Sequence, residues 1–294
     1  TYTYDTNWKD QLVEVTKNGN THHTFSYDQA GNPIRYKGAT LTWKRGRLLH
    51  KYNSIEMEYD ANGIRRTKQV PSGDNSGTTT YVYNGSNLVY EKQERPNTTR
   101  HKYFLYNNQG IIGFVYNTTT YMFRKNLFGD ITAIYRGNTK VAEYRYDAWG
   151  NCLVIDPATD LATDDFEFIG HQNPFRYRGY YWDNDLNLYY LMSRYYDPAT
   201  GRFINADSLE YLDPETIGGL NLYTYIGVSP NENTIGGHAS SHISNYSSNM
   251  NLQSIQCVDS NVLCISRPSR INFSARTSLY EPIETSFHCE TVPR

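Results

Sequence analysis

The sequence is poor in cysteine, in long apolar runs and in net charge. Four cysteines among 294 residues are too few for a disulfide scaffold in a chain of this length, so the core must rest on packing. No apolar run approaches the roughly 18 residues that a membrane-spanning helix needs, and the N-terminus lacks the charged and apolar regions of a signal peptide. The formal net charge is −2 and no block of Lys and Arg stands out, which argues against a nucleic-acid partner.

Tyrosine takes the place that leucine usually holds among the large residues. The chain has 28 Tyr but 19 Leu, although leucine ordinarily ranks among the commonest residues in proteins. Aromatic rings bury large areas, which a mean hydropathy of −0.70 understates. The apolar material available for a core is therefore aromatic.

One short phrase recurs along the first half of the chain: a Tyr-rich strand, then Asp or Asn, two variable residues, Gly and another strand. The Asp can accept hydrogen bonds from the turn backbone while Gly takes a positive φ, which is typical of a type I turn that closes into a bulge. Such tips follow one another 16 to 24 residues apart. Repetition at this period predicts a β-repeat protein in which each hairpin packs against its neighbours. The turn residues are Tyr27, Asp28, Gly31, Tyr59, Asp60, Gly63, Tyr106, Gly110, Tyr146, Asp147 and Gly150.

The remaining secondary-structure signals also favour strands. Ser54–Tyr59 and Thr40–Trp43 alternate apolar and polar residues with a period of two, as half-buried strands do. No stretch shows a long apolar stripe of helical period, and the best short-helix candidate lies around Asp207 to Leu212. The chain is predicted to be nearly all β.

A denser aromatic block, Phe175 to Tyr225, follows a loop over Asp156 to Asp165. Its central motif consists of Arg194, Tyr195, Tyr196, Asp197, Pro198, Gly201, Arg202 and Phe203. This block resembles the core domain of the rearrangement-hotspot (Rhs), or YD-repeat, proteins, a family that includes the C subunits of bacterial ABC toxin complexes and, distantly, the teneurins. Lys125–Asp130 and Ala142–Asn151 match phrases of the same family, and the resemblance covers about residues 1–228.

The resemblance implies a fold and a domain organisation. YD-repeat hairpins would form a spiralling sheet that is part of a hollow shell and ends in an inward-curling core domain. The YD repeats would occupy residues 1–155, the core domain 156–230, and a variable tail 231–294. Because the chain begins in mid-pattern and without Met, we interpret it as a part of a longer protein.

The resemblance also implies a function. In bacterial members the shell encloses a C-terminal toxin, so the expected function is that of a structural shell segment of a polymorphic toxin, secreted or at the cell surface. Its expected partners are its own C-terminal effector inside the shell, further YD repeats upstream and an immunity protein.

In the family, the core domain releases the toxin by an aspartyl-protease-like cleavage that needs two carboxylates. One carboxyl holds a proton while the other activates water. Asp207 matches the first position, but the second holds Ile235, or Thr234 with a one-residue gap, and Glu232 lies out of register. We therefore favour a structural role for Asp207, as a helix N-cap or turn residue, over a catalytic one. Release of the tail that Asp207→Ala abolishes would contradict this view.

The tail differs from the rest of the chain. From residue 231 only two of the 28 tyrosines remain and Lys disappears. The tail can be the start of an effector, although its Ser- and Asn-rich composition favours a truncated, frameshifted or disordered end. Cys257, Cys264, His288 and Cys289 do not have the spacing of zinc-ligand pairs, so no metal or cofactor is predicted.

A carbohydrate- or receptor-binding surface is the alternative function. Exposed Tyr and Trp stack on sugar faces, and repeats supply multivalency. The two hypotheses differ in where the aromatic rings point. If Tyr59, Tyr83, Tyr106 and Tyr146 are buried in the wall, the binding hypothesis loses its motive, whereas an exposed strip would make surface glycans the expected partner.

Overall fold

The computed structural model describes residues 1–73, 75–207 and 221–225, all of which lie in one compact unit. The short helix predicted to follow Asp207 lies outside these residues, as do Glu232, the tail and its cysteines. Within the described residues, no helix has the length and apolar character needed to cross a membrane.

A seventeen-stranded antiparallel sheet forms the wall of this unit. Each strand pairs with the next along the chain, so the sheet is a continuous meander. The strands are β1 (Tyr2–Tyr4), β2 (Leu12–Lys17), β3 (Asn20–Tyr27), β4 (Pro33–Tyr36), β5 (Ala39–Lys44), β6 (Leu48–Tyr52), β7 (Ile55–Tyr59), β8 (Arg65–Val70), β9 (Gly77–Asn84), β10 (Asn87–Arg95), β11 (Thr98–Asn107), β12 (Gly110–Tyr116), β13 (Thr119–Lys125), β14 (Ile131–Arg136), β15 (Thr139–Tyr146), β16 (Cys152–Asp156) and β17 (Leu161–Ala162).

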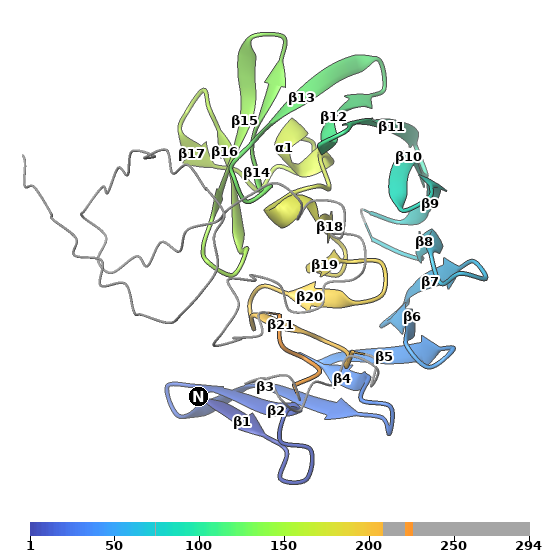
Figure 1. Ribbon diagram of the computed structural model, residues 1–294, viewed down its shortest axis with the longest axis vertical. Helices are drawn as coiled ribbons and strands as arrows, with labels where there is room; N and C mark the ends of the chain where they lie inside the picture. The colour runs from blue at the N-terminus through green and yellow to red at the C-terminus, as the bar shows by residue number, and fades with distance from the viewer. Residues whose placement is uncertain (74, 208–220, 226–294) are drawn as a thin grey trace, which may run out of the picture. The chain divides into compact units, whose positions relative to one another are not determined.

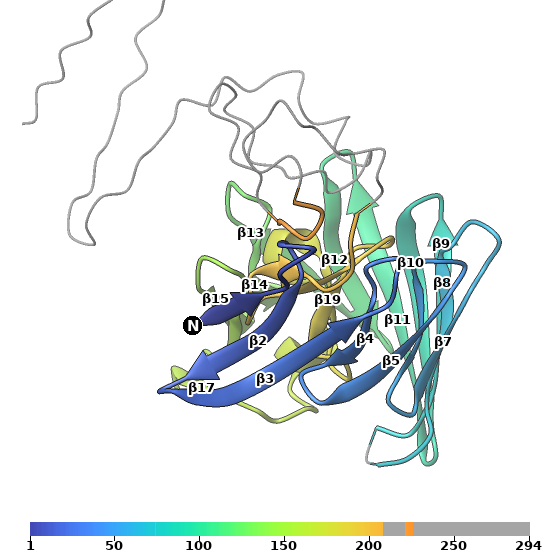
Figure 2. The same ribbon diagram turned by 90° about the horizontal axis from the view of Figure 1, so that it is seen from below.

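The aromatic block forms a second, four-stranded sheet inside the curve of the first. It consists of β18 (Tyr181–Asp183), β19 (Leu188–Tyr190), β20 (Tyr195–Asp197) and β21 (Arg202–Phe203). Figures 1 and 2 show the wall bending around these strands, and one hydrophobic cluster joins residues of both sheets. Among the described residues, α1 (Ile169–Gln172) and a single 3₁₀ turn are the only helical elements. The prediction of an all-β fold is confirmed.

Four hairpin tips of the wall share one hydrogen-bonding pattern. In each, the Oδ1 atom of the first turn residue accepts bonds from the backbone N–H groups two and four residues later, at 2.8 to 3.0 Å. The Gly three residues later has φ between 78° and 91°, a conformation that other residues rarely adopt. The first residues of these four tips are Asp28, Asp60, Asn126 and Asp147. The tip at Asn107 is tighter, because Tyr106 pairs with Ile111, five positions on.

A tyrosine precedes Asp28, Asp60, Asn107 and Asp147 and bonds to the neighbouring strand, whereas Lys125 precedes Asn126. The ring packs against the core, and the hydroxyl donates to a backbone carbonyl at 2.7 to 3.0 Å. Burial raises the pKa of these phenols, which keeps them protonated as donors. The pairs are Tyr27 with Leu12, Tyr59 with Leu49, Tyr106 with Leu88 and Tyr146 with Ile131. These rings and that of Tyr83 are partly buried against the core, which weakens the motive for a sugar-binding strip of them.

Candidate functional site

The hairpin tips of the wall meet the tyrosines of the inner sheet. One tip, residues 148–150, accepts three hydroxyl bonds through its backbone carbonyls at 2.8 to 3.0 Å. The donors are Tyr177, Tyr189 and Tyr196, of which Tyr189 and Tyr196 lie on β19 and β20. At the other end of the wall, Tyr223 donates to the carbonyl of Gly31 at 2.7 Å. Within the described residues, the turns leave these carbonyls without a partner in the wall, so they are free to accept bonds from the tyrosine hydroxyls. We call this contact between the hairpin tips and the inner tyrosines the junction.

The motif Arg194–Phe203 lies within this junction. Tyr195 contacts Tyr59 of the wall, with 2.9 Å between the two hydroxyl oxygens. Asp197 closes its own turn, because its Oδ1 accepts a hydrogen bond from the backbone N–H of Ala199 at 2.9 Å. Its Oδ2 accepts a hydrogen bond from the Tyr36 hydroxyl at 2.6 Å and forms an ion pair with Lys37.

The flanking motif residues make further contacts with the wall. The Pro198 carbonyl accepts from Asn151 at 3.2 Å, and Arg202 donates to the carbonyl of Asp10. Gly201 has a φ of 66° and packs under the Trp149 ring, while Phe203 is buried. The motif thus holds the inner sheet to the wall.

Asp207 is held by an ion pair. Its Oδ2 lies 2.9 Å from Nη2 of Arg194, whose guanidinium stacks on the Phe203 ring with 3.6 Å to the ring centroid. Its backbone N–H donates to the carbonyl of Leu222 at 2.9 Å. Ile235, Thr234 and Glu232, the candidates for the family's second carboxylate position, lie outside the described residues, so the expected lack of a two-carboxylate site stays a prediction. The geometry around Asp207 is that of a residue that anchors the chain.

A buried group of charges links the wall to β18. The Asp183 carboxylate forms ion pairs with Nη1 of Arg65 at 2.7 Å and with Nζ of Lys68 at 2.5 Å. All three side chains are at most 5% exposed. Lys68 also pairs with Asp185 at 2.7 Å. The Arg65 guanidinium lies against the Tyr190 ring, 4.4 Å from its centroid.

A second buried group lies beside the first. Glu91 of β10 pairs with Lys102 of β11 at 2.9 Å and accepts from the Tyr181 hydroxyl at 2.7 Å. Burial lowers the pKa of the Lys102 ammonium, and the Glu91 charge opposes this effect only in part. Sequence reasoning missed both groups. The available signal was that Lys68 precedes Val70 by two positions, which places a charge on the apolar face of β8.

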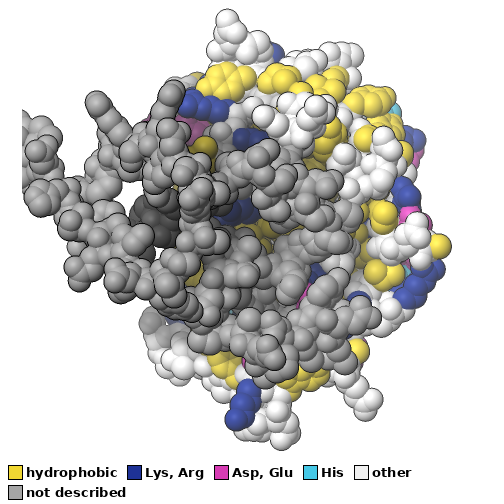
Figure 3. Space-filling view, viewed as in Figure 1, with side chains coloured by type: hydrophobic (Ala, Val, Ile, Leu, Met, Phe, Trp, Pro, Cys, Tyr) yellow, Lys and Arg dark blue, Asp and Glu magenta, His cyan; other side chains and the backbone are white. Residues whose placement is uncertain are grey.

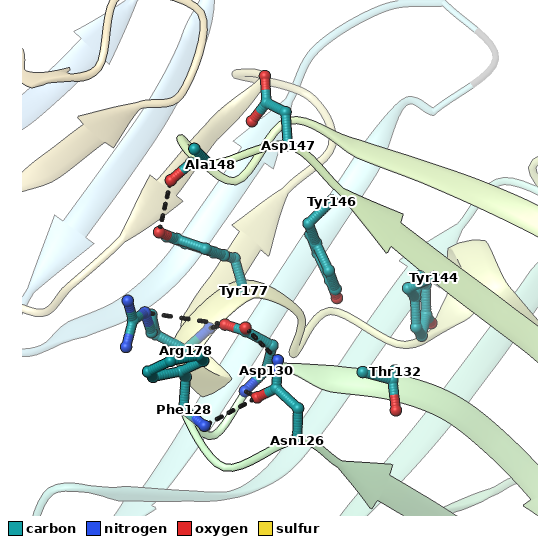
Figure 4. A pocket seen from close by; sticks show the side chains of 10 residues that line it. All are labelled: Asn126, Phe128, Asp130, Thr132, Tyr144, Tyr146, Asp147, Ala148, Tyr177 and Arg178. Atoms are coloured by element: carbon teal, nitrogen blue, oxygen red, sulfur yellow. Dashed lines mark hydrogen bonds and ion pairs between the residues drawn. The ribbon is translucent and has the colours of Figure 1, made fainter. Parts of the chain in front are cut away.

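A cavity of about 430 Å³ lies where the last repeats meet the 3₁₀ turn Tyr177–Gly179, which precedes β18. As Figure 4 shows, Tyr144 and Tyr146 come from β15, and Asp130 receives the backbone N–H of Arg178 at 2.8 Å. The residues that line the cavity combine aromatic rings with carboxylate, amide and guanidinium groups, which can stack on and hydrogen-bond to a ligand. They are Asn126, Phe128, Asp130, Thr132, Tyr144, Tyr146, Asp147, Ala148, Tyr177 and Arg178.

Comparison with known proteins finds relatives among bacterial toxins. The chain is 32% identical over 212 residues to the tRNA3(Ser)-specific nuclease WapA of Bacillus spizizenii, a match of 68% of this chain and 8% of that protein. It is 31% identical over 234 residues to the tRNA(Glu)-specific nuclease WapA of Bacillus subtilis subsp. natto, which covers 76% and 9%. A match of 81 residues at 35% identity, 28% of this chain and 5% of the relative, is to the double-stranded DNA deaminase toxin A of Burkholderia cenocepacia. The chain is an Rhs/YD-repeat, toxin-like protein.

This toxin-like chain spans only 8% to 9% of the length of the WapA relatives. No protein-family model matches it. Among solved structures, TcdB2-TccC3-TEV is similar over 77% of this chain and 12% of that chain, with a TM-score of 0.43 and 16% identity, and TcdB2-TccC3-Cdc42 over 76% and 15%, with a TM-score of 0.40 and 17% identity.

The stability of this toxin-like chain is expected to fall in two steps as the pH is lowered. Burial lowers the pKa of His171 below its ordinary value of 6.5, despite the contact of Nε2 with the Thr163 carbonyl at 2.7 Å. The unfolded chain therefore takes up a proton below pH 6.5 that folded His171 resists, and stability falls. Burial alone would raise the pKa of Asp183, but Lys68 and Arg65 hold it below 3.8. The stabilisation from Asp183 is present above pH 3.8 and is lost as the pH falls through the lowered pKa.

Urea titrations across these two pH ranges measure both steps. His171→Gln should reduce the step below pH 6.5, to which His23 with its lowered pKa also contributes, and leave the more acidic one in place. A first step of unchanged size in that variant would show that His171 is not its source.

Proposed function

We propose that this chain is a structural shell segment of an Rhs/YD-repeat polymorphic toxin and that the complete protein encloses a C-terminal effector. The observation that carries this proposal is the junction between the tips and the inner sheet. Tyr177, Tyr189 and Tyr196 donate hydrogen bonds to the backbone of one repeat tip. These bonds hold the inner sheet against the wall, so the two are not separate modules. A protein that acts by enclosure needs such a sealed end.

The names of the relatives support a common shell that encloses different effectors. Proteins named as a tRNA nuclease and as a DNA deaminase toxin both share sequence with this chain, although those two activities need different active sites. Residues 1–155 would then be YD repeats, 156–230 the core domain and 231–294 the variable part. The pairing of β16 with β17 carries the wall to Ala162, a few residues past that first boundary.

The partners of the segment follow from this role. They would be the chain's own effector and further YD repeats upstream, with an immunity protein for the producing cell. The complete protein would be secreted or lie at the cell surface. An autoprotease is the less supported role, since Asp207 is already engaged by Arg194. The binding-surface alternative is weakened by the orientation of the repeat tyrosines toward the core.

Protease accessibility tests enclosure. The tail carries trypsin sites at Arg270 and Arg276. In the complete natural protein, we expect cleavage at these two sites to be at least about tenfold slower than in a free peptide of residues 231–294, because a bond must be exposed and mobile to be cut. Equal cleavage rates in the two samples would contradict enclosure.

A control separates enclosure from folding of the tail itself. The same digestion is repeated with Asp183→Ala, which removes a buried charge that ties the inner sheet to the wall. If the shell protects the tail, this variant should be cut faster at Arg270 and Arg276. If the tail resists trypsin because it is folded, the rate should not change.

A further inference from the structure

A histidine and two glutamates converge on the outer face of the wall, away from the junction. His50 lies on β6, and Glu56 and Glu58 lie on β7. Nε2 of His50 is 3.2 Å from Oε1 of Glu56, and Nδ1 is 3.7 Å from Oε1 of Glu58. One potential ligand atom from each residue lies within 4.8 Å of the other two. Figure 3 shows basic, acidic and histidine side chains close together on the margin where Figure 1 places these strands.

The local sequence explains why the three side chains meet. The pairing of β5 with β6 shifts between Thr42 and Trp43, so His50 is an extra residue in the ladder. Such a bulge turns its side chain relative to the regular alternation. Glu56 and Glu58 share one face of β7 because they are two positions apart. Met57 between them points into the core and is fully buried.

The imidazole is oriented as in a metal ligand. Nδ1 of His50 lies 3.2 Å from the carbonyl oxygen of Met57. When Nδ1–H donates to that carbonyl, the lone pair of Nε2 faces Glu56, an arrangement that fixes the tautomer of metal-binding histidines. Two ligands held about 2.0 to 2.1 Å from a tetrahedral zinc lie about 3.3 Å apart. The distance of 3.2 Å from Nε2 to Glu56 matches that edge, whereas Glu58, whose Oε1 lies 3.7 Å from Nδ1, has to turn its side chain to reach an ion held at Nε2.

We propose that His50, Glu56 and Glu58 bind one divalent transition-metal ion of the Zn²⁺ class. An imidazole with two carboxylates suits Zn²⁺ better than Ca²⁺ or Mg²⁺, which prefer oxygen ligands alone. Lys44 and Lys51 compete for the carboxylates, at 3.0 Å from Glu58 and 3.4 Å from Glu56. Both lysine side chains are nearly half exposed, so an arriving dication displaces ion pairs that contribute little in water.

Zinc titration of the full chain tests this site. Thiolates bind zinc strongly, so the titration uses a background in which Cys257, Cys264 and Cys289 are each replaced by Ser. We expect one Zn²⁺ per chain, with the affinity lowered at least about tenfold in His50→Ala and in Glu56→Gln. The matched control is Glu143→Gln. Glu143 also lies on the wall between two cations, Lys140 and Arg145, but within the described residues no histidine pairs with it.

Two outcomes of the titration would overturn the proposal. One is the absence of stoichiometric zinc binding, and the other is equal affinity in His50→Ala and Glu143→Gln. Nitrogen chemical shifts of the His50 ring give a second readout that does not depend on folding of a variant. Zinc should convert the ring to the tautomer with a proton on Nδ1 and the metal on Nε2. If the chemical shifts show protons on both ring nitrogens and do not change when zinc is added, the ring is an imidazolium paired with Glu56. That result would refute the metal site.

Discussion

Replacing Asp183 with alanine is expected to lower the free energy of unfolding by about 3 to 5 kcal/mol. The carboxylate is fully buried and takes bonds from Arg65 at 2.7 Å and from Lys68 at 2.5 Å. Its removal leaves two cations in the interior, where neither is hydrated. Lys68 keeps Asp185, but the Nε and Nη2 atoms of Arg65 already have no hydrogen-bond partner. Most of the lost stability therefore comes from leaving the Arg65 guanidinium buried without a carboxylate partner.

Urea or guanidinium unfolding measures this loss, and two variants separate its causes. Asp183→Asn keeps the volume and removes the charge, so a loss of similar size would assign the effect to the charge rather than to a cavity. Asp160→Asn is the surface control, since its pair with Arg145 leaves the Asp160 side chain 77% exposed and such pairs contribute little. If Asp183→Ala were no less stable than Asp160→Asn, the buried group would have no structural role.

Gly150→Ala is expected to destabilise the protein by about 2 to 5 kcal/mol, the sum of backbone strain and overpacking. Gly150 has a φ of 91°, and a Cβ placed on it would lie 2.6 Å from the Tyr177 ring. The ring must then move, which breaks the bond from the Tyr177 hydroxyl to Ala148. The substitution also disturbs the Gly150 carbonyl that accepts from Tyr189.

Gly137→Ala is the matched control for this prediction. Gly137 is also at a hairpin tip with a positive φ, 58°, but a Cβ there would meet nothing within 4 Å. It should show only the backbone cost, about 1 kcal/mol. Thermal unfolding of both variants compares the two costs. Equal losses would mean that contact between the tip and Tyr177 adds nothing to stability.

The repeat tips were predictable because their interactions are local. The Oδ1 of Asp28, Asp60 or Asp147 bonds to N–H groups two and four residues later, and Gly completes the turn at a fixed spacing. Residue types and spacing are sufficient to specify such bonds. The same reasoning did not distinguish the tip at Asn107, where pairing resumes one residue earlier.

The junction could not be derived in the same way. Tyr223 and Gly31 are 192 positions apart, and Arg65 and Asp183 are 118 apart, so their contact depends on how far the sheet bends and not on spacing. The resemblance to Rhs proteins placed the motif Arg194–Phe203 in a core domain, but it did not say what each side chain would touch. Nor did it indicate that Asp207 would pair with Arg194.

The Tyr-Asp-x-x-Gly hairpins, the aromatic core and the all-β meander followed from the sequence alone, because turn chemistry and apolar alternation of period two are local properties. The curvature of the wall was needed to bring the tips onto the tyrosines of the inner sheet and to bury Asp183 between Arg65 and Lys68. The physical reason is that a hairpin is stabilised by bonds within a few residues, whereas a buried ion pair forms only where distant strands close around it and exclude water.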